Sequence, residues 1–315
     1  MATKSLGGRV ALVTGATRGI GKGIAIELGA AGATVYITGR TMISSDGQSG
    51  SLEETAEIIR NRGGQCIPIC VDHENVNETE SLFHRIATEQ DGRLDILVNN
   101  AFKAGTCVID NMGKSFWEVE PTLYDEINNV SVRNYYYCTV YAARLMVPRK
   151  QGLIVTISSL AGLTYFCNVP FGIGKAGCDR LAADTAVELK PHNIASISLW
   201  PGLVATETVN SLRLHNELGK MIESLGKTET PEYVGRIIVH LAQNSSLMQY
   251  TGKIVTTADY GIAHGIVDTD GQYPQNMRSL SFLMKNITGL QWLSSWIPSF
   301  FKIPCWILHQ FSNKF

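Results

Sequence analysis

A glycine-rich stretch near the N-terminus has the residue types and spacing of a phosphate-binding turn. Residues 14–21 read TGATRGIG. Gly15, Gly19 and Gly21 form a G-x-x-x-G-x-G pattern, with Ile20 between the last two glycines. Glycine permits a tight turn and a close approach of the backbone to a pyrophosphate. The N-terminus of a following helix offers unpaired N–H groups and a positive dipole end. The alternative is a tight strand–helix connection without a ligand, but the position at the start of an alternating chain favours nucleotide binding.

Two arginines beside this turn indicate which nucleotide is bound. The second predicted strand ends Ile-Thr-Gly-Arg at Arg40, without the carboxylate that accepts hydrogen bonds from the adenosine ribose of NAD. Arg40 and Arg18 instead suit charge-assisted hydrogen bonds to a 2′-phosphate. Each arginine taken alone is also explained as an exposed surface residue. Together they favour NADP(H) over NAD(H).

The elements that position these residues alternate along the chain. Short apolar or β-branched runs predict strands, and stretches of helical spacing lie between them. The predicted strands are residues 10–14, 34–38, 65–71, 94–98, 153–157, 194–199 and 253–258. The predicted helices are residues 21–31, 53–62, 79–90, 123–146 and 170–189. This alternation implies right-handed crossovers and a parallel sheet covered on both faces, which is an α/β, doubly wound, Rossmann-type fold.

The alternation ends near Gly261, and the composition changes beyond it. We therefore expect a single dinucleotide-binding domain over residues 1–265 and an aromatic-rich C-terminal extension over residues 266–315. The polar residues 44–51 are expected to form an enlarged loop after the second strand.

The composition excludes several classes of protein. The chain has 315 residues, of which 44% are hydrophobic and 17% charged, as in ordinary globular proteins. A net charge of −1 without a basic cluster argues against a nucleic-acid partner. The seven cysteines are scattered among apolar neighbours, so we expect neither a metal site nor disulfides. The same feature predicts that the protein resides in a reducing compartment. The short polar start of the chain predicts no signal peptide.

Further motifs give the chain a resemblance to the short-chain dehydrogenase/reductases over about residues 6–262. Besides the glycines, these are Asp72, Asn99-Asn100-Ala101 with Phe102 replacing the family's glycine, Asn129, Ile157-Ser158-Ser159, and Pro201-Gly202 with Thr206. The resemblance implies that Asp72 holds the adenine and that Asn99 belongs to the cofactor site. It also implies that Asn129 supports a water-linked proton relay and that the Pro201 loop lies on the nicotinamide side. The motifs YITGR at 36–40 and LWPG at 199–202, with the aromatic tail, indicate one branch of the family.

The resemblance also implies the chemistry, which is hydride transfer between nicotinamide and a carbonyl or alcohol carbon. In the family a tyrosine protonates the carbonyl oxygen, a lysine four residues later lowers the pKa of the phenol and holds the nicotinamide ribose, and a serine orients the oxygen. The lysine is Lys175 here. The serine is Ser159, with Ser158 as the alternative, because the loop is one residue short if Ser159 is chosen.

The tyrosine position is occupied by Phe171, because the chain reads Phe-Gly-Ile-Gly-Lys. Phenylalanine keeps the ring but has no proton to donate. General acid catalysis contributes ~10²–10⁴-fold, so turnover is expected to fall by that order. Tyr165 is six residues before the lysine, which is the wrong helical offset for a replacement. Three explanations remain open: an engineered substitution, a natural non-catalytic relative, or weak activity through water bridged by Lys175 and Ser159.

The C-terminal extension has the composition of a segment that lies at a membrane surface. Trp292, Trp296 and Trp306 lie among other aromatic and aliphatic residues, but Pro298, Lys302 and Pro304 interrupt the run, so a transmembrane helix is not expected. Aromatic residues interleaved with lysines suit the headgroup layer. The alternative is that the tail packs over the substrate cleft or forms a dimer contact. With the resemblance, this predicts location at the cytosolic face of the endoplasmic reticulum membrane, with a cytoplasmic protein as the alternative.

Two functions follow from these features. The first is an NADP(H)-dependent oxidoreductase for lipophilic carbonyl or alcohol substrates such as steroids, prostanoids or xenobiotics. Leu212, Leu214, Leu218, Met221 and Leu225 within 207–230 suit an apolar lid, although a helix packed on the core has the same pattern. The second is a non-catalytic NADP(H)-binding or scaffold protein, which Phe171 favours. The family resemblance implies a homo-oligomer that pairs through helices 123–146 and 170–189.

Overall fold

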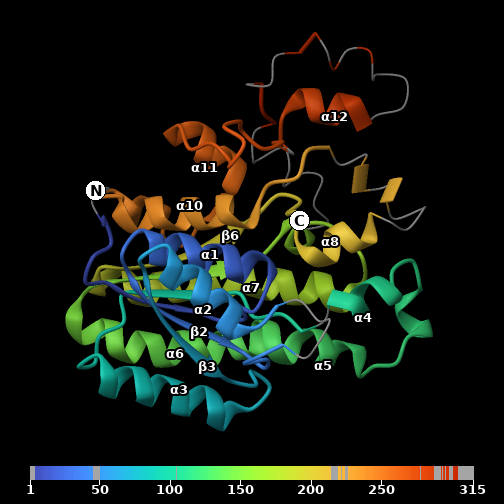
Figure 1. Cartoon of the computed structure of the whole chain (residues 1–315). Helices are drawn as coiled ribbons and strands as arrows, with labels where there is room; N and C mark the ends of the chain where they lie inside the picture. Colours follow the sequence, from blue (N-terminus) through green and yellow to red (C-terminus); the bar gives the residue numbers. More distant parts are fainter. Residues whose placement is uncertain are drawn as a thin grey trace.

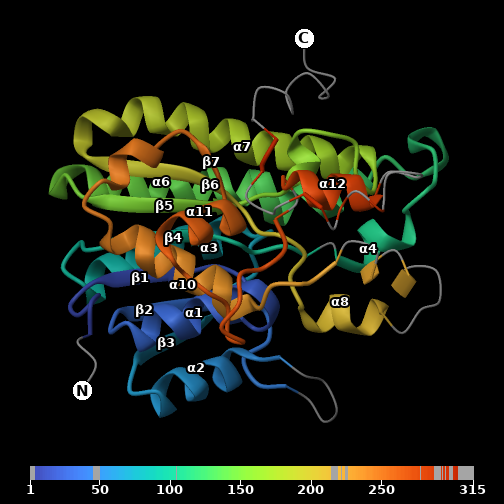
Figure 2. The ribbon, with the colours of Figure 1, turned by 90° about the horizontal axis from the view of Figure 1, so that it is seen from above.

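A seven-stranded parallel β-sheet forms the centre of the protein, with strand order β3-β2-β1-β4-β5-β6-β7 (Figures 1 and 2). The computed structural model describes residues 4–44, 50–103, 105–213, 219–220, 222–223, 226–276, 278–286, 292, 294, 296–297 and 301–303. The strands are β1 Val10–Val13, β2 Thr34–Gly39, β3 Gln65–Cys70, β4 Ile96–Asn99, β5 Gly152–Ile157, β6 Ile194–Trp200 and β7 Ile254–Thr256. The predicted doubly wound α/β fold is therefore confirmed.

Helices cover both faces of the sheet (Figure 1). One layer contains α1 Gly19–Ala30, α2 Leu52–Asn61 and α10 Pro231–Gln243, in which α1 contacts both of the others. The opposite layer contains α3 Val76–Glu89, α6 Asn134–Met146 and α7 Val169–Leu189, in which α6 contacts both of the others. Shorter helices are α4 Gly105–Asp110, α5 Leu123–Asn128, α8 Glu207–Leu212, α11 Thr257–His264 and α12 Leu280–Asn286.

The central strand β1 shows why the sheet needs both layers. Ala11 and Val13 belong to the hydrophobic core beneath α1 and α10, whereas Val10 and Leu12 belong to the core beneath α3 and α6. Successive side chains of a strand point to opposite faces, so a strand that is apolar at every position must be covered twice. Burial of both faces holds the ends of the strands in fixed positions, and the site is built on those ends.

The helix predicted over residues 123–146 is not continuous. It consists of α5, a five-residue π turn at Asn129–Arg133, and α6. Within the turn the backbone of Ser131 is non-helical, with φ −92° and ψ −109°. Its hydroxyl donates a hydrogen bond to the Ile127 carbonyl at 2.7 Å. A serine hydroxyl that bonds to the preceding turn competes with regular helix geometry, which explains the interruption.

The last predicted strand, residues 253–258, is also too long. The strand β7 ends at Thr256, whose side-chain oxygen accepts a hydrogen bond from the Asp259 amide and so caps α11. The cap turns the chain out of the sheet at this point. The helix α10, with the Thr230 cap and Pro231 in its first turn, is an element additional to the predicted ones.

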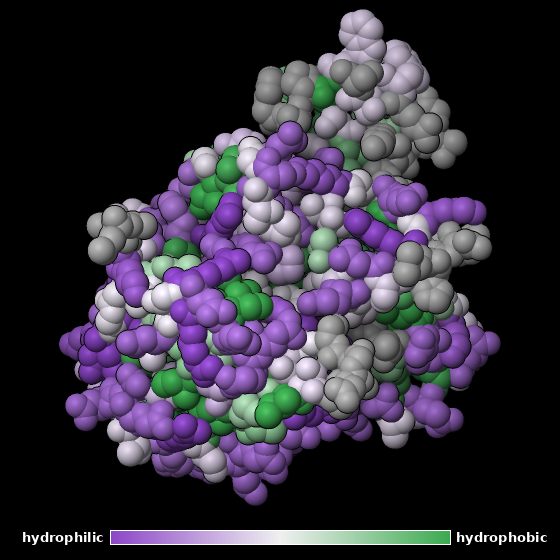
Figure 3. Space-filling view, in the orientation of Figure 1, coloured by the Kyte–Doolittle hydropathy of each residue, from purple (hydrophilic) through white to green (hydrophobic). Residues whose placement is uncertain are grey.

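The C-terminal extension stands out from the sheet-and-helix body (Figures 1 and 3). Its described part contains α12 and an antiparallel bridge between Ser279 and Lys302. Trp292 and Trp296 have exposed fractions of 66% and 80%. Within the described ranges, no helix combines the length and the apolar character needed to cross a bilayer.

Candidate active site

The predicted site residues come together where the parallel strands end. The amide of Asn100, after β4, donates hydrogen bonds to the carbonyls of Thr14 and Gly15, after β1, at 2.9 and 3.0 Å. A methyl group built on Gly15 would lie 2.6 Å from the Ala101 Cα, so the two loops touch through their backbones. At the other end of the turn, a methyl group built on Gly19 would lie 3.3 Å from the methyl carbon of Thr206, so these two residues are adjacent. The glycine-rich turn thus lies between the loops that follow β4 and β6.

Two glycines of the turn have backbone geometry that other residues rarely adopt. Gly15 and Gly19 have φ of +69° and +57°, in the left-handed region. A methyl group on Gly21 would lie 2.3 Å from the Gly15 carbonyl oxygen, so this position also requires glycine. Ile20 is partly buried and packs against the main core beneath α1. The turn is therefore shaped by close approach of backbone to backbone, as a dinucleotide-binding turn requires.

The N-terminus of α1 carries an anion in this structure. Arg18, the residue before the helix, makes no side-chain cap, and the first turn contains no acidic residue. Instead the Gly19 amide donates a hydrogen bond to the carboxylate of Glu207, on α8, at 3.0 Å. The Glu207 carboxylate thus occupies the place that the positive end of the helix dipole offers to a phosphate.

The other predicted cofactor residues have different environments. Arg18 and Arg40 are exposed, and no carboxylate pairs with either of them within the described part of the chain. Asp72 follows β3, and its carboxylate accepts a hydrogen bond from the Glu74 amide at 3.0 Å. Asn99 is buried, and its amide donates to the Thr139 hydroxyl at 3.0 Å, so its side chain supports the core rather than the open site. Pro201, Gly202 and Thr206 are partly exposed.

Lys175 is a buried cation between two aromatic rings. Its ammonium nitrogen donates to the Ile157 carbonyl, at the end of β5, at 3.1 Å. The nitrogen lies 5.4 Å from the ring centre of Phe102 and 5.8 Å from that of Phe171, within the range of cation–π attraction. Burial lowers the pKa of Lys175, with Cys178 and Asp179 opposing that shift. The aromatic rings and the carbonyl stabilise the charged form within a poorly solvated site.

The two candidate serines have different surroundings. The hydroxyl of Ser158 is buried and donates to the Lys175 backbone carbonyl at 3.0 Å, so it joins β5 to α7. Ser159 is partly exposed, and its oxygen accepts a hydrogen bond from the Ala161 amide at 3.3 Å. In the described contacts, the Ser158 hydroxyl hydrogen is used by the Lys175 carbonyl, whereas the Ser159 hydroxyl only accepts a hydrogen bond and can still donate one to a ligand. The geometry therefore favours Ser159 as the substrate-orienting serine.

Phe171 stands where the family has a tyrosine, and no other phenol hydroxyl among the described residues is shown to take its place. The centre of the Phe171 ring lies 5.9 Å from that of Phe102, edge to face, and its backbone amide bonds to the Asn168 side chain, which caps α7. Tyr165 is 65% exposed, and its hydroxyl bonds to the Cys167 carbonyl at 3.5 Å. Neither feature brings the Tyr165 hydroxyl toward the lysine.

Asn129 opens the π turn, which packs against α7. The neighbouring Asn128 is buried, and its amide donates to the Pro170 carbonyl at 3.1 Å, at the start of α7. Asn129 itself is partly exposed. The π turn therefore fixes the position of α7, and with it Phe171 and Lys175.

Three functional positions were not predicted from the sequence. Asn100 was noted only as part of a motif, although its amide fixes the glycine-rich turn. Glu207 was seen only as the start of a lid. Glu229 lies within the same range, 207–230, without a pattern that marks it. Leu214, Leu218, Met221 and Leu225 of the expected lid lie outside the described residues. Of the three, only Asn100 lies in a recognisable sequence motif. Glu207 and Glu229 cannot be distinguished from other loop carboxylates by sequence, because such residues are common in polar loops.

Glu229 is a buried carboxyl that joins three parts of the site. Its side chain accepts hydrogen bonds from the Gly202 amide at 3.1 Å and from the Thr257 hydroxyl at 2.8 and 3.1 Å. Its backbone pairs with Leu203 and Ala205. Burial raises the pKa of Glu229 to about 8, although the bonds from Thr257 and Gly202 oppose the shift. The carboxyl connects the nicotinamide-side loop to the start of α11.

Glu229→Gln is expected to change how stability depends on pH. Between pH 4.5 and about 8 the unfolded chain releases the Glu229 proton while the folded chain keeps it, so wild-type stability falls as pH rises. The largest slope is about 1.4 kcal/mol per pH unit. Glutamine cannot ionise, so the variant gains stability relative to wild type between pH 5 and pH 8. Urea unfolding at both pH values measures this, with the exposed Glu188→Gln as control. A wild-type-to-variant difference that is the same at both pH values would contradict the assignment.

Comparison with known proteins agrees with this site. The family described as short chain dehydrogenase matches residues 9–217. "Dehydrogenase/reductase SDR family member 1" of Homo sapiens is 43% identical over 98% of this chain and 99% of the relative, so the likeness includes the C-terminal extension. The 3-oxoacyl-[acyl-carrier-protein] reductase of Aquifex aeolicus is 32% identical over 79% of this chain and 96% of the relative. A crystal structure from Agrobacterium tumefaciens with bound NADP has a TM-score of 0.67 and 26% identity, and covers 84% of this chain and 100% of that one.

These matches confirm the family and the branch that the sequence motifs indicated. The family match covers the glycine-rich turn, the serines, the Phe171–Lys175 pair and the nicotinamide-side loop. The chain belongs to the short-chain dehydrogenase/reductases, a family of NAD(P)-dependent oxidoreductases.

Proposed function

We propose that the protein is an NADP(H)-dependent oxidoreductase that reduces the carbonyl group of lipophilic molecules, or oxidises the corresponding alcohols, with turnover limited by Phe171. Steroid-, prostanoid- or xenobiotic-like carbonyl compounds are the proposed substrates. The observation that carries the proposal is the buried Lys175 ammonium, bonded at 3.1 Å to the last residue of β5, two residues before Ser159. A cation at the end of the strand that leads to Ser159 suits an oxygen that gains negative charge.

Each residue has a separate role in the proposed reaction. NADPH, when bound, supplies the hydride. The Ser159 hydroxyl donates a hydrogen bond to the carbonyl oxygen and fixes its position. The Lys175 charge stabilises the oxygen as it becomes negative, and the rings of Phe102 and Phe171 stabilise the ammonium by cation–π attraction. With no hydroxyl at position 171, the proton reaches the oxygen through water held by Lys175 and Ser159, which is a weaker arrangement.

NADP(H) is proposed as the cofactor in preference to NAD(H). Arg18 and Arg40 are exposed, without carboxylate partners in the described residues, at the ends of the glycine-rich turn and of β2. Their guanidinium groups suit a 2′-phosphate. The Agrobacterium tumefaciens relative was solved with NADP, in agreement with this choice.

A non-catalytic NADP(H)-binding protein is the second candidate. The packing of Phe171 favours it, because its ring lies edge to face with Phe102 in a closed aromatic pair. In this alternative the nucleotide site is retained, and binding of NADPH controls a ligand or partner instead of a reaction.

We propose two further properties that concern the whole molecule. The exposed Trp292 and Trp296 suit the headgroup layer of a membrane, and the proposed location is the cytosolic face of the endoplasmic reticulum. A homo-oligomer paired through α5–α6 and α7 is proposed because these helices carry exposed apolar side chains, namely Tyr136, Ile173 and Val187.

Phe171→Tyr is expected to increase turnover by about 10²-fold or more, because it restores a proton donor four residues before Lys175. NADPH oxidation at 340 nm with a panel of lipophilic ketones and quinones measures the effect, and the same panel with NADH tests the cofactor preference. Phe116→Tyr, which adds a phenol at an exposed position, is the control. If wild type and Phe171→Tyr bind NADPH equally and neither oxidises it, the enzyme proposal fails and the binding role replaces it.

A chain ending at Gly271 is expected to lose affinity for phospholipid vesicles that contain anionic lipid, because the aromatic extension is absent. Co-sedimentation with vesicles compares this chain with the full one. Equal binding of both would refute the membrane role of the extension.

A further inference from the structure

A large cavity lies along the free edge of β7, beside α11. Its volume is about 600 Å³, within the range of small-molecule sites. Its walls are mainly aromatic and aliphatic, and include Trp200, Tyr250, Ile254, Tyr260 and Ala263. None of these residues belongs to the glycine-rich turn or to the Phe171–Lys175 pair. The mechanism proposed above leaves this space without a role.

The cavity adjoins a smaller one that borders the nicotinamide-side loop. The smaller cavity, of about 60 Å³, lies between Leu160, which follows Ser159, and Gly202 of the nicotinamide-side loop. The two cavities share Trp200, Thr256 and Arg278 in their linings. These three side chains form the partition between the catalytic end and the larger space.

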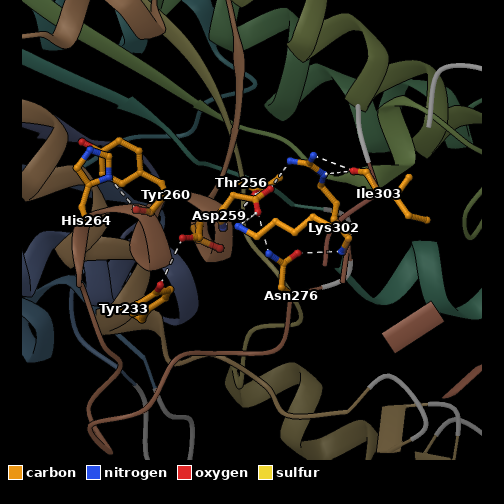
Figure 4. A network of polar contacts seen from close by, with 10 residues as sticks. Tyr233, Thr256, Asp259, Tyr260, His264, Asn276, Lys302 and Ile303 are labelled. Carbon is orange, nitrogen blue, oxygen red and sulfur yellow. Dashed lines mark hydrogen bonds and ion pairs between the residues drawn. The ribbon is translucent and has the colours of Figure 1, made fainter. Parts of the chain in front are cut away.

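Arg278, which belongs to this partition, is contributed by the C-terminal extension and pairs with Asp259, the centre of the polar network in Figure 4. Its guanidinium bonds to the Ile303 carbonyl at 2.9 Å and pairs with the Asp259 carboxylate on α11. The same carboxylate binds Lys302 at 2.8 Å and the Asn276 amide at 2.8 Å. Asp259 thus binds side chains from two segments of the extension, one that contains Asn276 and Arg278 and one that contains Lys302. Arg278 is held there by hydrogen bonds and ion pairs rather than by core packing.

The chemistry of the larger cavity selects an apolar ligand. Several polar groups in its walls are already engaged within the protein, since the Tyr250 hydroxyl pairs with His264 at 3.3 Å and Asp259 is bound by the extension. The apolar side chains of Trp200, Ile254 and Ala263 remain to contact a ligand. A carbonyl at Ser159 with a long apolar body matches this arrangement of a narrow catalytic end and a wide apolar end.

We infer that the cavity along β7 is the outer compartment of the substrate site, which takes the apolar body of an elongated carbonyl compound under the C-terminal extension, with Arg278 as the partition. The inference rests on the proposed function and specifies its substrate by length. It assigns a role to the extension in the same chain, because Arg278 of the extension lines the compartment.

Binding of two ketones of different length tests the inference. The full-length chain is saturated with NADP⁺, which has no hydride to give, and calorimetry measures the affinity for 2-hexanone and 2-decanone. Each buried methylene strengthens binding about fourfold, so 2-decanone is expected to bind roughly 10²-fold more tightly. Ala263→Trp fills the compartment from α11 and is expected to weaken 2-decanone binding at least tenfold without affecting 2-hexanone. Ile254→Trp fills it from β7 and is expected to do the same.

Ile262→Trp is the matched control, because this neighbouring exposed residue does not line the cavity. NADP⁺ affinity and thermal unfolding confirm that all three variants are folded. If Ala263→Trp and Ile254→Trp leave the 2-decanone affinity unchanged, the compartment is wrong while the oxidoreductase proposal stands. If neither ketone binds to the wild-type complex with NADP⁺, the carbonyl chemistry fails as well.

Discussion

The rest of the site depends on which group accepts hydrogen bonds from the unpaired amides at the N-terminus of α1. The helix starts at Gly19 without a side-chain cap or an acidic first turn, and its first amide bonds to the Glu207 carboxylate. A helix end of this kind favours an anion. The glycine turn, the Asn100 amide bonds and the start of α8 are all arranged around the place where that anion lies. A pyrophosphate bound there, as proposed, would compete with the Glu207 carboxylate for the Gly19 amide.

The second constraint is electrostatic and concerns Lys175. A buried ammonium is stable only if its charge is compensated. Here the Ile157 carbonyl and the faces of Phe102 and Phe171 provide that compensation. The replacement of a phenol by a phenyl ring therefore leaves the position of the lysine intact while it removes the proton donor.

The sequence predicted those features that depend on local backbone geometry or on burial of both sheet faces. The glycine turn could be located because Gly15 and Gly19 need left-handed conformations, and β1 could be located because every residue is apolar. The π turn at Ser131 was missed because it depends on one hydroxyl that bonds to the preceding turn. Glu229 was missed because its partners Gly202 and Thr257 are 27 and 28 residues away, and only packing makes that carboxyl buried. The cavity under the extension likewise requires contacts between Asp259, Arg278 and Lys302.

The central claim is that the N-terminus of α1, where the Gly19 amide bonds to the Glu207 carboxylate, is a nucleotide-diphosphate site. Calorimetric titration of the full chain and of Glu207→Gln with NADPH tests it directly, with Glu188→Gln as control. We predict one NADPH site per chain, and an affinity several-fold higher in Glu207→Gln, because the cofactor no longer displaces a carboxylate. Absence of NADPH binding to all three chains, or weaker binding by Glu207→Gln, would contradict the account.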